Sequence, residues 1–177
     1  MCEHASHGAA CFPINVKSLA NLILDWSDEA GLAITPMKLQ KLVYFCHADF
    51  LVQFNQPLVA QEFEAWEYGP VVPSLFQEFK SFGSGAITSR AREFDPVECE
   101  LRRAKSAFLG DKVATVRDSF DAYARYTASA LSKLSHTEWG PWAEALRRFK
   151  LGTIRGRSID NRLIAACHRH PGQQQVH

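Results

Sequence analysis

The sequence lacks any apolar run close to the roughly 18 residues that a membrane-spanning helix requires. Its first residues, Met1-Cys2-Glu3-His4, also lack the basic start and apolar centre of a signal peptide. The 5 cysteines are odd in number and widely scattered, and a chain of 177 residues can build a hydrophobic core without disulfides. We therefore expect a cytoplasmic protein that has reduced thiols and does not contact a membrane.

Motifs of common enzymes and cofactor sites are absent as well. The chain has no G-x-S-x-G elbow, P-loop, G-x-G-x-x-G turn, H-E-x-x-H helix or paired carboxylates. Cys46 with His136, or Cys99 with His47, could form a catalytic pair, but Cys46 falls on an apolar stripe, where a small buried thiol is common. We expect His47 and Asp49, beside that stripe, to be solvated. We expect no enzyme and no cofactor, with an uncharacterised enzyme as an alternative.

The N-terminus carries residues that are chemically able to bind zinc, namely Cys2, His4, His7 and Cys11. Their spacing, C-x-H-x₂-H-x₃-C, matches none of the usual zinc-finger patterns. We expect no metal site, and these four residues are the candidates if one exists.

Apolar periodicity predicts a mainly α-helical fold in a single compact multi-helix domain. One helix follows Asn15 and stops at Gly31, and a central helix runs from Pro36 to Phe54, with Thr35 as its N-cap. A short β or extended element is expected around residues 61–72, since QEFEAWEY is aromatic and bounded by prolines. The expected domain covers residues 15–168, between a mobile extension at 1–14 and a frayed tail at 169–177.

Shorter helices complete this prediction. Pro73 opens one that ends at Gly83, and Asp95-Pro96-Val97-Glu98 resembles a capping box that starts another, which runs through Phe108 to Gly110. The remaining helices are expected after Asp111, after Thr127, from Pro141 to about Phe149, and after Ser158. Asp111 and Ser158 would cap their helices, Thr127 would open the next one, and Pro141 would be a first helical residue.

Charge is unevenly distributed along the chain. Residues 1–100 carry a net charge of −7 and residues 101–177 a net charge of +8. Either the two halves pack together through complementary surfaces, or the second half presents a basic face to an acidic partner. The residues of that basic contact surface would be Arg147, Arg148, Lys150, Arg155 and Arg157. Few aromatic residues accompany them, so a nucleic-acid-binding regulator is the alternative function and not the preferred one.

Two stretches resemble a known family. The first runs from Thr35 to Phe45 (TPMKLQKLVYF) and continues from Glu62 to Leu75 (EFEAWEYGPVVPSL). The second runs from Leu134 to Trp142 (LSHTEWGPW), and residues 158–161 are similar to a closing helix. In order and spacing, residues 15–168 resemble the Panacea-domain family, which includes SocA-like antitoxins and GepA-like phage-associated proteins.

The resemblance implies an antitoxin that neutralises a cognate protein toxin by direct contact, with some members also acting as adaptors that present a toxin to a protease. It names neither the toxin nor the oligomeric state. The motif residues either hold loops against the core or contact the partner. They are Met37, Lys38, Leu39, Gln40, Lys41, Leu42, Tyr44, Trp66, Tyr68, Gly69, Pro70, Val71, Pro73, Ser74, His136, Pro141 and Trp142.

Overall fold

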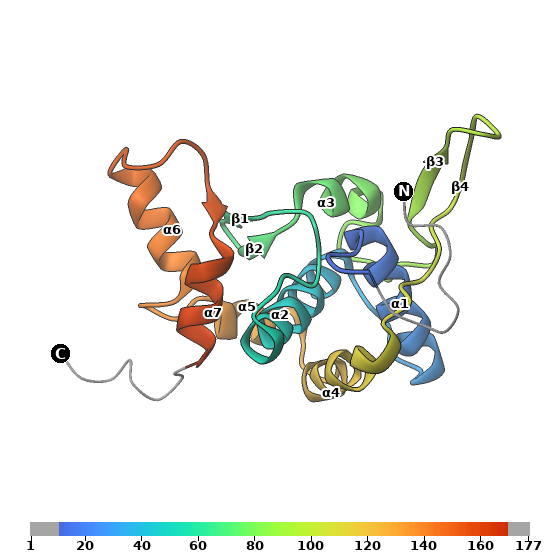
Figure 1. The fold of residues 1–177 in the computed structure, drawn as a ribbon, viewed down its shortest axis with the longest axis horizontal. Coiled ribbons are helices and arrows are strands. Elements are labelled where there is room, and N and C mark those ends of the chain that lie inside the picture. Colours follow the sequence, from blue (N-terminus) through green and yellow to red (C-terminus); the bar gives the residue numbers. More distant parts are fainter. Residues whose placement is uncertain (1–10, 170–177) are drawn as a thin grey trace.

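The computed structural model describes residues 11–169, and helices make up most of its regular structure (Figure 1). The helices are α1 (Val16–Glu29), α2 (Pro36–Phe54), α3 (Pro73–Phe79), α4 (Val113–Tyr123), α5 (Ala128–Ser135), α6 (Pro141–Lys150) and α7 (Asn161–Arg169), with single 3₁₀ turns at Lys80–Phe82 and Gly110–Lys112. The strands are β1 (Phe63–Trp66), β2 (Gly69–Val71), β3 (Arg92–Asp95), β4 (Glu100–Arg103) and β5 (Ser158–Ile159). The expected mainly α-helical fold with a short β element is confirmed.

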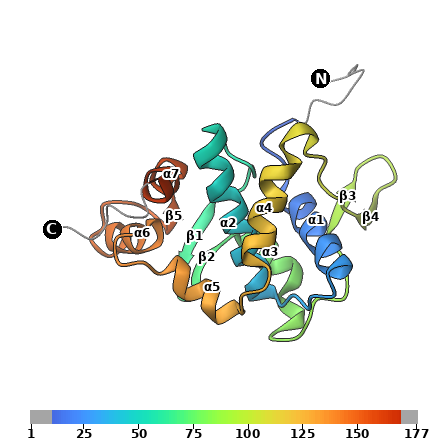
Figure 2. The same cartoon turned by 90° about the horizontal axis from the view of Figure 1, so that it is seen from below.

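Helix α2 lies at the centre of the molecule (Figure 2). Thr35 caps it by accepting a hydrogen bond from the Lys38 backbone N–H, and Asn55 ends it in the left-handed conformation. The predicted stripe is buried, and aromatic contacts surround the helix: Tyr44 meets Phe63 of β1 at a ring-centroid distance of 5.4 Å. Because other elements cover α2 on every side, its apolar residues are not restricted to one narrow face.

A small antiparallel sheet joins the middle of the chain to its end. Its strand order is β2-β1-β5, with Trp66 opposite Gly69 and Phe63 opposite Ile159. Strand β5 therefore ties the segment between α6 and α7 to the β1–β2 hairpin. These two helices lie together at the end of the molecule where the described chain finishes.

Two residues that we assigned to the N-terminal extension contact the domain. The backbone N–H of Ile14 donates to the Leu58 carbonyl at 2.8 Å, and Phe12 packs against Phe50 with ring centroids 4.8 Å apart. Residues 1–10 lie outside the described residues, as does most of the expected C-terminal tail. The proposed boundaries of the domain otherwise stay a prediction.

The predicted helix from Asp95 to Phe108 is wrong. Residues 92–103 instead form the two-stranded β3–β4 hairpin, hereafter the arm. Asp95 Oδ1 does accept hydrogen bonds from Val97 and Glu98, as in a helix cap, but Cys99 then adopts a left-handed φ of 52°, and the chain turns back. The same Asp side chain that caps a helix also stabilises a turn, so the capping pattern alone did not distinguish them.

The expected cap of the last helix is also wrong by two residues. Ser158 pairs in the sheet, and Asp160 caps α7 by accepting from the Arg162 N–H at 2.7 Å. Likewise, Asp111 lies inside a 3₁₀ turn that precedes α4 and does not cap it. The other expected helices, including those that start at Pro73 and Pro141 and after Thr127, are present.

The central position of α2 predicts that it controls stability. Replacing the fully buried Leu42 by Ala should lower the free energy of unfolding by about 2–5 kcal/mol, because transfer energy is lost and a cavity remains. Urea unfolding measures this change. The matched change at the exposed Leu151 should shift it by less than about 0.5 kcal/mol. Equal effects of the two substitutions would contradict the burial of α2.

Candidate functional site

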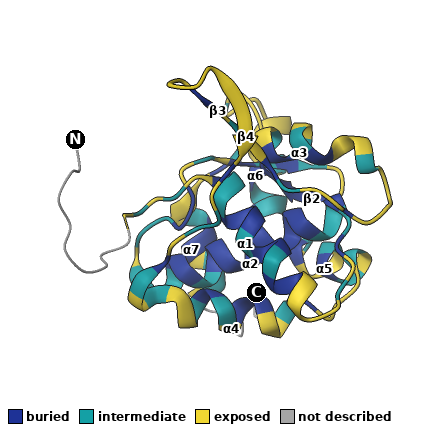
Figure 3. Ribbon diagram, turned by 90° about the vertical axis from the view of Figure 1, so that its right-hand side faces the viewer, coloured by how far each residue is buried: buried dark blue, intermediate teal, exposed yellow. Residues whose placement is uncertain are grey.

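The motif residues come from three separate parts of the sequence, and most of them meet beside the first half of α2. They are contributed by α2 itself, by the β1–β2 hairpin with the start of α3, and by the junction of α5 and α6. Figure 3 shows that the ribbon of α2 is largely buried, whereas much of the ribbon of the elements around it is exposed. The site is therefore a hairpin packed on a buried helix, and the residues of its turn, Glu67 and Tyr68, are exposed.

Gln40 holds the chain where β2 leads into α3. Its side-chain Oε1 accepts from the Val72 N–H at 2.9 Å, and its Nε2 donates to the Val72 carbonyl at 3.3 Å. This amide thus replaces the two backbone partners that a neighbouring strand would supply. The Val72 carbonyl also accepts from the Phe76 N–H at 3.0 Å, so removing the buried Gln40 would leave the Val72 N–H without a partner, which is costly in a protein interior.

Lys41 fixes the turn between β1 and β2. Its Nζ donates to the Pro70 carbonyl at 2.9 Å, and the side chain is only 1% exposed. Burial lowers the pKa of this amine to about 7. Gly69, with φ 102°, is required here because a Cβ atom would lie 2.5 Å from Ser135 Oγ and 2.7 Å from Lys41 Nζ.

The α5–α6 junction holds the hairpin from its other side. Ser132 Oγ donates to the Tyr68 carbonyl at 3.0 Å, and His136 Nε2 lies 3.1 Å from the Glu67 carbonyl. Trp142 packs edge-on against His136 with ring centroids 3.9 Å apart. Its Nε1 donates to the Trp66 carbonyl at 2.7 Å. Carbonyl groups of Trp66, Glu67 and Tyr68 are therefore all contacted by side chains of α5 and α6.

The two serines of this junction, Ser132 and Ser135, were not among the predicted site residues. Ser132, Ser135 and His136 are spaced i, i+3 and i+4, which places them on one face of α5. That spacing was available in the sequence, but only the fold shows that the face points at the hairpin.

A largely apolar groove of about 480 Å³ runs beside this supported hairpin. Its walls include Met37, Trp66, Tyr68 and Phe76, with Lys80 as a charged residue of the wall. Trp66 packs on Phe76 at a centroid distance of 5.0 Å, whereas Tyr68 is 60% exposed. The motif thus supplies both the support of the hairpin and the aromatic surface beside it.

The other motif residues lie in the core or begin helices. Leu39, Leu42 and Tyr44 are buried along α2, Val71 is buried in β2, Pro73 and Pro141 begin α3 and α6, Ser74 is exposed, and Lys38 is half-buried. Burial lowers the pKa of Lys38 and raises that of Tyr44, whose hydroxyl lies 3.2 Å from His168 Nε2. Of these residues, Val71 lines the groove, and the others do not.

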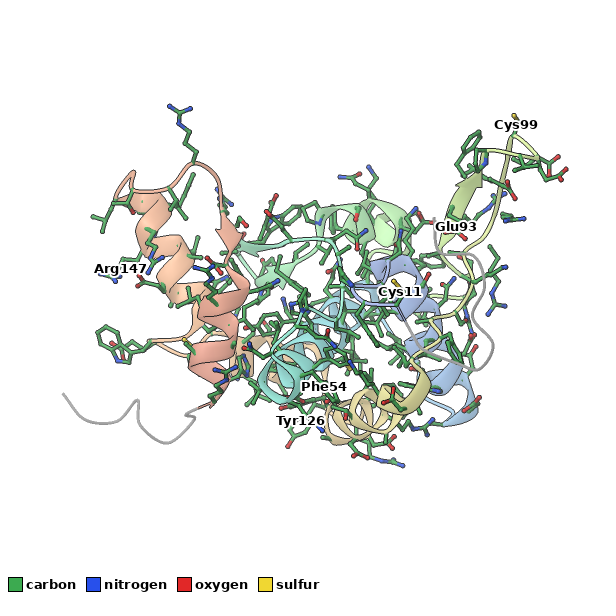
Figure 4. All side chains as sticks on the ribbon, in the orientation of Figure 1. Cys11, Phe54, Glu93, Cys99, Tyr126 and Arg147 are labelled. Carbon is green, nitrogen blue, oxygen red and sulfur yellow. The ribbon has the colours of Figure 1, made fainter. Side chains whose placement is uncertain are left out.

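The predicted basic residues lie at the α6 end of the molecule, away from the groove (Figure 4 labels Arg147). Arg147 and Arg148 both pair with Glu144, and the Arg157 guanidinium stacks over Phe149 at 5.2 Å. Lys150 and Arg155 are exposed, with no ion pair among the described residues. Part of the positive charge is therefore neutralised within α6, and part remains available.

The candidate catalytic pairs are not assembled. Cys46 is buried, its thiol directed at the Val116 carbonyl, and burial raises its pKa, whereas His136 lies at the hairpin. Cys99 is exposed on the arm. The expectation that His47 is solvated is wrong: it is fully buried, accepts from the Val59 N–H and contacts Asn161, and burial lowers its pKa to about 4.

Two findings concern metals and membranes. Within residues 11–169, no three His, Cys, Asp or Glu side chains gather as metal ligands. Cys11 is exposed, and Cys2, His4 and His7 lie outside the described residues. Among the helices of residues 11–169, none is both long and apolar enough to span a membrane.

Comparison with known proteins identifies relatives of this chain. The family model described as "Antitoxin SocA-like, Panacea domain" matches residues 39–143. The chain is also 33% identical to "Antitoxin SocA" of Caulobacter vibrioides (strain NA1000 / CB15N) over 129 residues, which cover 73% of this chain and 69% of that protein. No solved structure matches. The family match includes the α2 motif from Leu39, the hairpin and the α5–α6 junction.

The burial of Lys41 predicts a pH-dependent stability. Its pKa is about 7 in the folded chain, against about 10.4 for an unfolded lysine. The unfolded chain therefore binds more protons between these values, so that Lys41 raises the free energy of unfolding by up to about 1.4 kcal/mol per pH unit there.

Urea unfolding of the parent and of the Lys41→Met variant, followed from about pH 7.5 to about pH 8.5, isolates this contribution, because other titrating groups cancel in the difference. We expect the difference in stability between the parent and the variant to shift in favour of the parent as pH rises. Parallel pH profiles would show that Lys41 is not buried as an uncharged amine.

Proposed function

The chain belongs to the SocA-like antitoxin family that carries the Panacea domain, and from that membership we propose that it neutralises a partner toxin by direct protein–protein binding. The observation that carries this proposal is the groove beside the β1–β2 hairpin. Motif residues hold the hairpin from two sides, and motif aromatics line the surface that it presents. An arrangement of this kind favours binding, because the surface is ordered before a partner arrives.

The groove has the composition of a protein interface. Trp and Tyr residues are enriched among the side chains that dominate binding energy, and the flexible Met37 adapts to partners of different shape. Tyr68 offers an exposed ring at low conformational cost, since its backbone carbonyl is already fixed by Ser132. We infer that the toxin contacts this surface around Tyr68.

Binding without turnover is the mechanism that these residues support. The pairs of cysteine and histidine that could have formed a nucleophilic site lie apart, and the buried Lys41 amine is engaged by a backbone carbonyl. Neutralisation would then follow from covering a functional surface of the toxin. Delivery of the bound toxin to a protease is compatible with the same contact and is distinguished below.

The surface position of Tyr68 and the support role of Trp142 predict different mutational effects. Tyr68→Ala should weaken toxin binding by about thirtyfold or more, equal to about 2 kcal/mol, with stability unchanged. Trp142→Ala should lower the free energy of unfolding by about 3 kcal/mol, because the Trp66 carbonyl loses its donor and His136 its packing.

Urea unfolding measures stability, and co-purification with the product of the adjacent gene measures binding. That product is the first candidate toxin, and it is accepted as the toxin only if it arrests growth. Tyr126→Ala is the matched control, since that tyrosine is also about half exposed and lies outside the groove. Unchanged binding by Tyr68→Ala would place the interface elsewhere, and parallel losses of stability and binding would assign Tyr68 to the core.

The absence of turnover makes a second prediction, concerning stoichiometry. When this protein and its toxin are expressed from separately controlled promoters, growth rescue should follow their ratio. Complete rescue by a small fraction of an equivalent would contradict neutralisation by occupancy and favour an enzyme. Rescue that requires a particular cellular protease, with loss of the toxin from the cell, would assign the adaptor role.

A further inference from the structure

The arm projects from the body of the protein (Figure 1), and much of its ribbon is exposed (Figure 3). Phe94 and Leu101 are directly opposite in the register, so both lie on one face, and they are 61% and 56% exposed. Val97 at the tip is 83% exposed. A two-stranded ribbon with an uncovered apolar face is marginally stable by itself, and such a patch is typical of a contact surface.

The base of the arm is fixed to the body. Asn21 donates to the carbonyls of Ala91 and Ala104 at 3.1 and 2.7 Å and accepts from the Ala91 N–H at 2.7 Å. Arg90 and Arg103 both pair with Asp25 of α1. The arm is therefore presented in one direction, which reduces the entropy lost when it binds.

The tip of the arm is acidic. Arg102 and Arg103 are paired with Asp95 and Asp25. Glu98 and Glu100 are exposed and have no ion pair among residues 11–169. The surface that would complement this tip is a hollow that offers both apolar and basic side chains.

The protein itself has a hollow with apolar, polar and charged side chains at its other end. A cavity of about 510 Å³ lies between α6, β5 and the start of α7, and its lining includes Ile154, Ile159, Leu163, Arg148 and Arg155. Glu62 and Asp160 also line the cavity; they accept hydrogen bonds from the Ser158 hydroxyl and the Arg162 backbone N–H, and neither of these partner groups carries a positive charge. Arg155 has no ion pair within the described chain, and the exposed Lys150 and Arg157 add positive charge on the same segment.

We propose that the arm of one copy docks in this cavity of a second copy. The apolar face of Phe94, Val97 and Leu101 would enter the hollow, and Glu98 and Glu100 would meet Arg155 and Lys150. The arm and the elements around the cavity, α6, β5 and α7, lie at opposite ends of the molecule in Figures 1 and 2, so one copy cannot make this contact within itself.

The geometry determines the kind of assembly. Each copy uses two different surfaces, so the contact is head-to-tail and yields a closed ring or an open chain, in contrast to a two-fold dimer. One hairpin tip covers less area than the roughly 1,200–2,000 Å² of stable interfaces, so the association is weak and reversible. It depends on salt, because exposed charges contribute to it.

Two charge-reversed variants test the pairing. The arm variant is Glu98→Arg with Glu100→Arg, and the cavity variant is Lys150→Glu with Arg155→Glu. Arg125→Glu with Lys133→Glu is the matched control, since both residues are exposed and line neither surface. Light scattering gives the mean mass of each protein across a dilution series.

The parent and the control should gain mass with concentration, and the gain should shrink between about 0.1 M and about 1 M salt as the Debye length falls from about 10 Å to about 3 Å. Each reversed variant alone should associate at least about tenfold more weakly. An equimolar mixture of the two variants should recover association, because each reversed surface then finds an opposite one. Recovery also shows that both variants are folded.

Four outcomes would overturn the proposal. In the first, the parent stays monomeric at every concentration, and in the second, the mixture of the two variants does not recover association. In the third, the cavity variant associates like the parent while the arm variant does not. In the fourth, the parent is monomeric and the arm variant loses toxin binding. The third outcome would indicate pairing between two arms, and the fourth would assign the arm to the toxin interface. None of these four outcomes depends on the groove, so the proposed antitoxin function is tested separately.

Discussion

The β1–β2 hairpin depends on polar side chains of α2 that reach it through the core. A hairpin of so few residues cannot satisfy all of its backbone groups by strand pairing, and groups left without partners in a protein interior are costly. Gln40 satisfies both groups of Val72, and Lys41 satisfies the Pro70 carbonyl. The groove, the exposed Tyr68 ring and the entry into α3 all depend on these contacts, because each follows directly from the position of the turn.

Charge in this protein is arranged by region, and the two halves of the sequence do not simply neutralise each other. Arg102, Arg103 and Arg117 pair across the halves with Asp95, Asp25 and Glu29. In α6, by contrast, Glu144 pairs locally with Arg147 and Arg148. The acidic tip of the arm and the basic α6 region lie at opposite ends of the fold. The groove shares no lining residue with the cavity, so the proposed toxin contact and the proposed self-association do not use the same residues.

Sequence patterns predicted the features that depend on local chemistry. Thr35, Pro36 and Asn55 delimited α2, and the proline-bounded aromatic segment indicated β1, as the structure confirms. The arm was mistaken for a helix because Asp95 satisfies neighbouring N–H groups equally well in a turn. His47 was misplaced because its burial is set by Asn161 and Val59, which approach from distant parts of the chain. The family was recognised from its motifs, but the division of those motifs between support and surface required the fold.

The motif contains a lysine at position 41 although burial disfavours its charged form, and the Pro70 carbonyl explains why. An apolar side chain of similar length would fill the same space and avoid the desolvation that lowers the pKa of this amine to about 7. It would, however, leave the Pro70 carbonyl without its donor, and the turn could then shift to seek water. Gly69 reinforces this constraint, since its lack of a Cβ lets the amine and Ser135 approach the backbone closely. Lys41 and Gly69 therefore specify one position of the hairpin, and a surface that must fit a partner needs that single position more than it needs additional stability.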